Sequence, residues 1–295
     1  GEDQGEAVML AEARRIGFPV MIKASAGGGG RGMRLVAEEA AFADALRAAH
    51  SEAQNAFGDP HVILERAIVR PRHIEIQVFG DRHGNAIHLG ERDCSVQRRH
   101  QKLIEEAPSP AVSTELRARM GATAVAAVKA IRYEGAGTLE FLLDDAGEFY
   151  FMEMNTRLQV EHPVTEAITG LDLVELQLRV AAGEPLPVRQ EDVTFSGHAI
   201  EVRLCAEDAA HDFMPQSGRM LRWQAPAALR VEDALESGCE IPPFYDSMIA
   251  KLVSHGRSRD EARRRLAAGL AEMTALGITT NQAFLRRCLD HPVFA

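Results

Sequence analysis

The sequence lacks the features that would assign it to a membrane or to a nucleic acid. Its apolar runs stay below the ~20 residues needed to cross a bilayer, and its acidic start, Gly1-Glu2-Asp3, is unlike a secretory or transit peptide. The 33 basic side chains are scattered and are outnumbered by 43 acidic ones, which gives a net charge of −10. Neither a membrane nor a nucleic acid is therefore expected as the main partner.

Paired cysteines, an initiator Met and lysines are also missing or scarce. The cysteines lie far apart, which argues against a zinc site or a disulfide framework and favours buried thiols in a reducing, cytoplasmic compartment. Because the chain starts without Met, we expect it to begin inside a longer parent protein. Arg makes up 29 of the 33 basic residues, so Lys is either retained where a compact ammonium is needed or placed by chance. The cysteines are Cys94, Cys205, Cys239 and Cys288, and the lysines are Lys23, Lys102, Lys129 and Lys251.

The patterns that are present predict an α+β fold. A strand, a glycine loop, a second strand, a helix and a third strand give the arrangement of a small lid, and the chain becomes strongly β-prone from Val62. Helices are expected over 6–16, 37–57, 113–131, 164–169, 171–182, 259–276 and 281–289. Strands are expected over 20–24, 33–36, 62–68, 73–80, 86–90, 137–143, 148–155, 199–204, 218–223 and 229–233, with a flexible connection at 185–190.

The glycine loop at 27–32 predicts a phosphate-binding segment. Lys23 lies on the strand before the glycines, and a β-prone segment follows them, which contradicts both the order of a P-loop and that of a dinucleotide fingerprint. A glycine hairpin could instead fold its N–H groups over phosphates while Lys23 meets them from the strand. A flexible linker is the alternative.

Polar side chains alternate with mostly apolar ones between residues 153 and 161. Glu153, Asn155, Arg157, Gln159 and Glu161 would share one face of an extended chain. Carboxylates and an Asn suit a hard cation such as Mg²⁺, whereas Arg and Gln donate hydrogen bonds to a small oxyanion. An unbroken strand would spread this set over about 26 Å, so we expect the chain to bend after about Asn155.

A hairpin between two predicted strands brings a second carboxylate to the first. With an even-length turn, Glu140 and Glu153 project from adjacent strands on the same face. Two opposed carboxylates repel unless a cation or a proton bridges them, so the pair predicts a magnesium site. A solvated acidic pair is the alternative, although both residues lie inside apolar runs.

Three segments together resemble the biotin carboxylase component, or alpha subunit, of biotin-dependent acyl-CoA carboxylases, in the ATP-grasp superfamily. They are Lys23 with its glycine loop, ERDCSVQRRHQK at 91–102, and MNTRLQVEH at 154–162. The resemblance implies an α+β ATP-grasp fold, with a glycine-loop lid at 1–68, an antiparallel-sheet body carrying the metal and bicarbonate site at 69–188, and the biotin carboxylase C-terminal domain at 189–295. It also implies that the family's N-terminal domain and a biotin-carrying Met-Lys-Met segment are missing here, so we expect weak activity from this chain alone.

The resemblance assigns roles to individual residues. The implied ATP-binding residues are Lys23, Gly28, Gly29, Gly30, Gly32, Glu65, Arg66, Ile68, His73 and Gln97. The implied metal ligands are Glu140, Glu153 and Asn155, and the implied bicarbonate-binding residues are Lys102, Arg157, Gln159 and Val160 through its backbone. Glu161 would remove the proton of bicarbonate, and Arg203 would stabilise the oxyanion of biotin, with Lys102 and Arg157 as the other catalytic groups.

Several of these roles have alternatives. Arg203 could form a structural ion pair with Glu201 or Glu207. Cys94 with Lys102 could act as the base, but an ordinary thiol with a pKa of about 8.5 is mostly protonated at neutral pH, which favours Glu161. His100 and His162 lie within the motifs and could be structural or catalytic.

The resemblance implies an ATP-dependent ligase that carboxylates biotin with bicarbonate through carboxyphosphate. Its partners would be ATP, Mg²⁺ or Mn²⁺, bicarbonate, a biotin carboxyl carrier domain and a carboxyltransferase subunit, within a homodimer. Another ATP-grasp ligase, such as a carboxylate–amine ligase, would share Lys23, Glu140 and Glu153, and only the 157–161 segment and Arg203 discriminate against it. A non-catalytic nucleotide-binding fragment is the third hypothesis.

Overall fold

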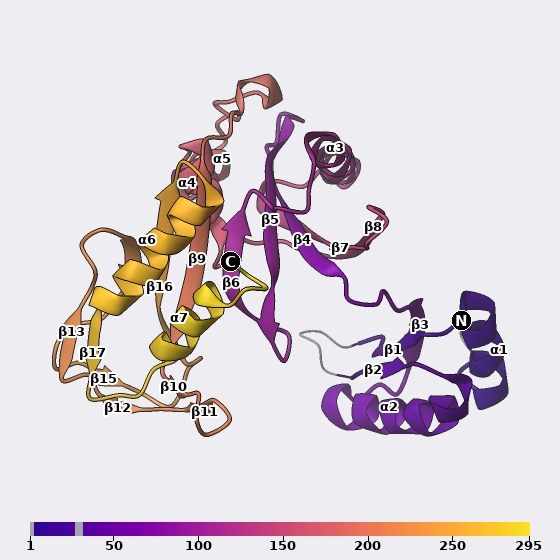
Figure 1. The fold of residues 1–295 in the computed structure, drawn as a ribbon. Helices are drawn as coiled ribbons and strands as arrows, with labels where there is room; N and C mark the ends of the chain where they lie inside the picture. The colour runs from indigo at the N-terminus through magenta and orange to yellow at the C-terminus, as the bar shows by residue number, and fades with distance from the viewer. Residues whose placement is uncertain (1–2, 27–31) are drawn as a thin grey trace. The chain divides into compact units, whose positions relative to one another are not determined.

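The computed structural model describes residues 3–26 and 32–295 of the chain (Figure 1). It divides into two compact units, Gly1–Pro71 and Arg72–Ala295. The predicted boundary at residue 68 remains a prediction, because the unit boundary marks compactness and not the end of a domain. Within the described residues, no helix is long and apolar enough to span a bilayer.

The first unit is a three-stranded antiparallel sheet with two helices. Its elements are α1 (Glu6–Ile16), β1 (Val20–Ala24), β2 (Met33–Val36), a 3-10 turn (Glu39–Ala41), α2 (Phe42–Phe57) and β3 (Val62–Arg66). The strand order β2-β1-β3 places β1 in the centre. Ala13, Ile22 and Phe42 form its core together with Leu46, so the two helices pack on the sheet through one apolar cluster. The helix expected over 37–57 begins only at Phe42, because Glu39–Ala41 form a 3-10 turn before it.

The second unit is built on an eight-stranded sheet in the order β14-β16-β9-β6-β5-β4-β7-β8, with antiparallel neighbours. Its strands are β4 (Arg72–Gly80), β5 (Ala86–Arg98), β6 (Gln101–Ala107), β7 (Gly135–Leu143), β8 (Phe149–Asn155), β9 (His198–Cys205), β14 (Arg230–Asp233) and β16 (Met248–Gly256). Short strand pairs are added by β10 (Glu207–Asp208), β11 (Met214–Pro215), β12 (Gly218–Arg219), β13 (Arg222–Gln224), β15 (Glu240–Ile241) and β17 (Thr274–Leu276).

The helices of this unit cover the two faces of the sheet differently. They are α3 (Thr114–Ala130), α4 (His162–Thr169), α5 (Leu173–Ala181), α6 (Arg259–Glu272) and α7 (Gln282–Asp290), with a 3-10 turn at Gln190–Asp192. One face is apolar: Ile74 and Ile76 of β4 pack with α3, and Val202 of β9 packs with α6 and α7. The residues that alternate with these point to the opposite face, where α4 packs on β9, β6 and β16.

Several sequence predictions need correction. The strand expected over 86–90 continues to Arg98, so most of the 91–102 motif lies on β5. The helix expected over 259–276 ends at Glu272, because residues 274–276 pair with β13 instead. The strand expected over 218–223 breaks into β12 and β13. The expected connection at 185–190 is anchored, since Leu186 N donates to Asp81 Oδ2 at 2.8 Å.

Candidate active site

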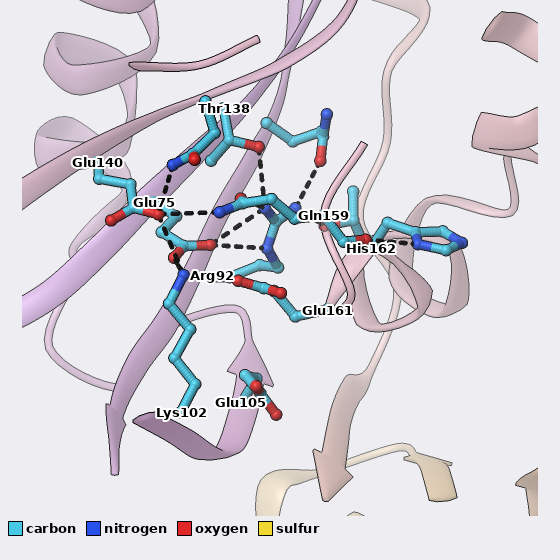
Figure 2. A network of polar contacts seen from close by, with 12 residues as sticks. Glu75, Arg92, Lys102, Glu105, Thr138, Glu140, Gln159, Glu161 and His162 are labelled. Atoms are coloured by element: carbon cyan, nitrogen blue, oxygen red, sulfur yellow. Dashed lines mark hydrogen bonds and ion pairs between the residues drawn. The ribbon is translucent and has the colours of Figure 1, made fainter. Parts of the chain in front are cut away.

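Polar side chains gather on the face of the large sheet that lies opposite α3, α6 and α7 (Figure 2). They come from β4, β5, β6, β7 and β9 and from the segment between β8 and α4. We call this set the charge network. Its members are Glu75, Arg92, Lys102, Glu105, Glu140, Gln159, Glu161 and Arg203.

Lys102 joins three carboxylates of the charge network. Its Nζ donates to Glu161 Oε1 at 2.7 Å, to Glu140 Oε1 at 3.1 Å and to Glu75 at very short range. Burial opposes its charge, but Glu75 and Glu161 outweigh burial and raise the pKa of Lys102. Lys102 is therefore a fixed cation between the expected metal ligand Glu140 and the expected base Glu161.

Glu140 is the carboxylate at which the expected metal ligands converge. Asn155 Nδ2 and Gln159 Nε2 each donate to Glu140 Oε1 at 2.8 Å, and His73 Nε2 lies 2.9 Å from Oε2. Although burial opposes ionisation, contacts with His73 and Lys102 hold the pKa of Glu140 at about 2. Burial likewise opposes the charge of His73, but its carboxylate neighbours raise the His73 pKa to about 9. This corner is anionic and already attracts cationic groups.

Glu153 lies directly opposite Glu140 in the register of β7 and β8, as the hairpin predicts. Its side chain is exposed, whereas that of Glu140 is buried. The chain leaves the strand at Asn155, where the bend was expected, and α4 begins at His162, two residues earlier than predicted. The bend allows Glu161 to return to Lys102.

Arg92 is the structural centre of the charge network. Its guanidinium is fully buried and donates to side chains from β4, β7, α4 and the segment before α4. The acceptors are Glu75 at 3.1 Å, Gln77 at 2.6 Å, Thr138 at 3.1 Å, Gln159 at 2.9 Å and Thr165 at 3.1 Å. Burial disfavours the charge of Glu75, but His73 and Arg92 overcome it and lower the Glu75 pKa to about 2.

Arg203 contacts the expected base directly. Its Nη2 donates to Glu161 Oε2 at 3.0 Å, and its Nε donates to Glu105 Oε1 at 2.6 Å. Among residues 3–26 and 32–295, the carboxylates that Arg203 contacts are Glu105 and Glu161, so the structure does not contain the alternative ion pair with Glu201 or Glu207. Burial opposes the charge of Arg203, yet Glu105 and Glu161 raise its pKa.

The remaining expected bicarbonate residues differ in their surroundings. Gln159 is buried between Arg92 and Glu140, and the carbonyl oxygen of Val160 accepts from Lys251 at 2.8 Å. The Arg157 side chain is exposed, 3.4 Å from Asn155 Oδ1. Arg157 also lines a cavity of about 610 Å³ beside α5.

The expected nucleotide residues are divided between the units. In the first unit, Lys23 lies on β1 with Nζ 3.1 Å from Glu65 Oε2 on β3, where Arg66 is the last residue, and Ile68 follows that strand. Gly32 has a φ of +70°, and a Cβ there would lie 2.8 Å from Ala24 Cβ, so glycine is required. Gly28, Gly29 and Gly30 lie outside the described residues. In the second unit, Gln97 Nε2 donates to Cys94 O at 2.7 Å.

The structure weighs against the alternative base and separates the two motif histidines. Cys94 is fully buried, and burial raises the pKa of its thiol well above the usual value, so it is a poor base. His162 is buried, with Nδ1 2.8 Å from Gln159 O, which fits a structural role. His100 lies in the exposed turn between β5 and β6 with a φ of 67°.

Sequence reasoning missed Glu75, Arg92 and Glu105 as site residues. The signal for Glu75 was present, because polar residues alternate with Ile74 and Ile76 along β4. Arg92 belongs to the 91–102 motif, but the resemblance assigned it no role. Its hydrogen-bond partners come from four other segments. No local pattern could connect Glu105 to Arg203, because that contact depends on the pairing of β6 with β9.

Two family models match the chain. The model described as carbamoyl-phosphate synthase L chain, ATP binding domain, matches residues 1–189. The model described as biotin carboxylase C-terminal domain matches residues 201–295. Together they cover both ends of the large sheet.

Curated relatives carry related names. The chain is 52% identical over 297 residues to the mitochondrial methylcrotonoyl-CoA carboxylase subunit alpha of Dictyostelium discoideum, covering 100% of this chain and 42% of that protein. It is 52% identical over 287 residues to a biotin carboxylase of Nostoc sp., covering 97% of this chain and 64% of the relative. The chain thus spans roughly two fifths to two thirds of the length of these relatives.

Solved structures agree in fold. A biotin carboxylase of Campylobacter jejuni, solved as a β-γ-ATP complex, matches with a TM-score of 0.94 at 47% identity, over 98% of this chain and 65% of that one. The biotin carboxylase domain dimer of Hydrogenobacter thermophilus 2-oxoglutarate carboxylase, solved with MgADP and bicarbonate, matches with a TM-score of 0.93 at 46% identity, over 98% of this chain and 64% of that one. By sequence and by fold, the chain belongs to the biotin carboxylase family of the ATP-grasp superfamily.

Proposed function

We propose that the protein carboxylates biotin, using ATP and bicarbonate, as the first half-reaction of a biotin-dependent carboxylase. One observation carries the proposal: the Glu161 carboxylate lies 2.7 Å from Lys102 Nζ and 3.0 Å from Arg203 Nη2, and Lys102 also contacts Glu140. A base, two cations and an expected metal ligand are thereby joined through direct contacts. The solved relatives whose names include bicarbonate, MgADP and ATP support the same substrates.

In the first step, Glu161 removes the proton of bicarbonate. Bicarbonate is a poor nucleophile, and its oxygen attacks the γ-phosphoryl group of ATP more readily when a carboxylate takes its proton. Lys102 and Arg157 would neutralise the anion, while Gln159 and the backbone N–H of Val160 would orient it. The attack releases ADP and forms carboxyphosphate.

The donor set at Glu140 fits Mg²⁺. Glu140, Glu153 and Asn155 all offer oxygen ligands, and Glu140 is ionised at any physiological pH. Rotation of the Asn155 amide would turn its oxygen, in place of its nitrogen, toward a shared cation. When bound, the metal would neutralise charge on the ATP phosphates.

In the second step, carboxyphosphate breaks into CO₂ and phosphate, and the phosphate removes the N1 proton of biotin. The ureido oxygen of biotin then becomes negative. Arg203 would stabilise this oxyanion, because its guanidinium stays charged and donates several parallel hydrogen bonds. N1 of biotin attacks CO₂ and yields carboxybiotin.

Nucleotide binding is proposed for residues of each unit. In the first unit, Lys23 and the glycine loop with Gly32 would hold phosphates, and Glu65, Arg66 and Ile68 would contact adenine. In the second unit, His73 and Gln97 would contact the ribose and phosphates. A charged ammonium and backbone N–H groups are the donors that phosphate oxygens require.

The partners and the location follow from the proposed reaction. A biotin carboxyl carrier domain would present the substrate, a carboxyltransferase would consume carboxybiotin, and the protein would act as a homodimer. The related Hydrogenobacter domain is named as a dimer, which supports the last point. We propose a cytoplasmic location, in keeping with the free cysteines, although several relatives are named as mitochondrial.

The test is ATP hydrolysis by the full-length protein that contains this chain. We expect hydrolysis to require bicarbonate, to rise with free biotin, and to fall by about two orders of magnitude or more in Glu161→Gln, because the general base is lost. Glu236→Gln, the same change at an exposed side chain, serves as the matched control. Bicarbonate-independent hydrolysis that depends on a carboxylate and an amine would instead support another ATP-grasp ligase, and tight ATP binding without turnover would support a non-catalytic protein.

A further inference from the structure

Two buried carboxyl groups, Glu105 and Glu201, lie side by side beneath Arg203 and have no role in the reaction as described above. In the antiparallel register of β6 and β9, Glu105 is directly opposite Glu201. Both side chains are fully buried. Arg203 lies two residues beyond Glu201 on the same strand, so all three side chains leave the sheet on one face.

The hydrogen bonds of the pair are unequal. Glu105 Oε1 accepts from Arg203 Nε at 2.6 Å. Both oxygens of Glu201, and Oε2 of Glu105, find no hydrogen-bond partner among residues 3–26 and 32–295. An ionised carboxylate without a partner is strongly disfavoured in a buried position, whereas a neutral carboxyl is tolerated far better. Arg203 therefore favours the charge on Glu105, and the proton belongs on Glu201.

We propose that Glu201 holds a proton and is neutral, so that its anionic neighbour Glu105 positions Arg203 for the carboxylation of biotin. This inference rests on the proposed function. Its chemical basis is the change in charge at Glu161: once Glu161 has accepted the proton of bicarbonate, its ionic contact with Arg203 weakens. Glu105 then holds the guanidinium through Nε, while the Nη groups are released toward the oxyanion of biotin.

The electrostatic surroundings support the division of roles. Burial raises the pKa of Glu201 well above its usual value, and the nearby Glu105 raises it further. Burial also raises the pKa of Glu105, to about 7, although Arg203 opposes the shift. Glu105 is then anionic above about pH 7 and neutral below it. The charged and titratable groups that face the pair are Cys94 on β5, Lys102 on β6, Arg203 on β9, Lys251 on β16 and Glu161 at the start of α4.

Two matched substitutions in the full-length protein separate the roles. Glu201→Gln replaces a neutral carboxyl by a neutral amide of the same shape, so biotin-dependent turnover should stay within about threefold of wild type. Glu105→Gln removes the charged acceptor of Arg203, so kcat should fall by about tenfold or more with an unchanged KM for ATP. In wild type, kcat should also fall as the pH drops through about 7, and Glu105→Gln should lack this component of the profile.

Glu106→Gln is the control for a purely structural effect. Glu106 follows Glu105 on β6 but points to the other face, where it accepts from Arg259 at 2.6 Å and contacts His198 at 2.8 Å. This variant should lower thermal stability and leave the pH profile of kcat unaltered. Equal losses in Glu105→Gln and Glu201→Gln, or a wild-type profile in Glu105→Gln, would overturn the proposal.

Infrared spectroscopy locates the proton without relying on turnover. A band from a buried protonated carboxyl should be present in wild type at about pH 8, where Glu105 is mostly ionised, and absent from Glu201→Gln. If the band is present but biotin-dependent turnover is absent in wild type, the proposed function is wrong and the protonation of Glu201 stands. If the band persists in Glu201→Gln, the proton is not on Glu201 and this inference is wrong, whatever the activity.

Discussion

Two ion pairs of equal length, one in each unit of the chain, differ in what surrounds them. Lys23 Nζ lies 3.1 Å from Glu65 Oε2 in the first unit, with side chains 22% and 46% exposed. Arg92 Nη2 lies 3.1 Å from Glu75 Oε2 in the second unit, and both side chains are 0% exposed. Water screens the first pair and competes for it, whereas the second pair depends entirely on neighbouring side chains.

The difference shows that the buried ion pair holds the fold together, whereas the partly exposed pair can be replaced. Because Lys23 is partly solvated, it can exchange Glu65 for a phosphate at little loss to the fold. Arg92 cannot exchange partners, since its donors are bound to acceptors on four surrounding segments. The buried pair thus fixes the positions of groups such as Gln159, and the exposed pair leaves Lys23 available for a ligand.

Removing the charge of Arg92 should have the largest effect on stability. In Arg92→Leu, Glu75 loses a buried cation and several polar side chains lose their donor, so the free energy of unfolding should fall by about 3–5 kcal/mol. Urea denaturation followed by circular dichroism measures it. Arg119→Leu, which removes an exposed partner of Glu148, is the control and should change stability by less than about 1 kcal/mol. A similar small change in Arg92→Leu would show that burial adds nothing to the pair.

Glu201→Gln should instead raise the free energy of unfolding. A carboxyl with a raised pKa binds its proton in the folded state while the unfolded chain releases it, so this group lowers stability as the pH rises above its unfolded pKa near 4.5. Without that ionisable group, the variant should gain about 1–3 kcal/mol over wild type at pH 8, and the gain should shrink toward pH 4. Denaturation at both pH values measures it, with the exposed Glu236→Gln as control. A pH-independent difference would contradict a protonated Glu201.

Lys23→Gln should have the smallest effect on stability. Because the pair with Glu65 is partly solvated, its loss should lower the free energy of unfolding by less than about 1 kcal/mol. Binding of ATP by the full-length protein should nevertheless weaken by about tenfold or more, since a charged donor to phosphate is lost. Titration with a fluorescent nucleotide measures the second quantity. Unchanged ATP affinity would remove Lys23 from the proposed site.

Much of the fold was readable from local patterns. The β-prone runs at 20–24, 73–80 and 137–143 predicted strands that the structure confirms, and the Glu140 and Glu153 pairing followed from hairpin register alone. The element ends were less predictable. Residues 274–276 continue the helical pattern of α6, but pairing with β13 takes them into a strand, which is a tertiary effect.

The site was readable only where its residues belong to one segment. Asn155, Gln159 and Glu161 were found because they alternate within nine residues, and the structure brings all three to Lys102 or Glu140. Glu105 escaped notice because its contact with Arg203 spans 98 residues of sequence. Strand order in the sheet decides such contacts, and single-sequence patterns do not encode it.

The central claim is that an oxygen of bicarbonate, freed of its proton by Glu161, attacks the γ-phosphoryl group of ATP. Turnover of the full-length protein with ¹⁸O-labelled bicarbonate, free biotin and MgATP tests it directly, because the attacking oxygen remains with phosphorus when carboxyphosphate breaks down. The account predicts one labelled oxygen in the inorganic phosphate, by mass spectrometry, for each carboxybiotin formed. Phosphate free of label, with carboxybiotin still produced, would contradict it.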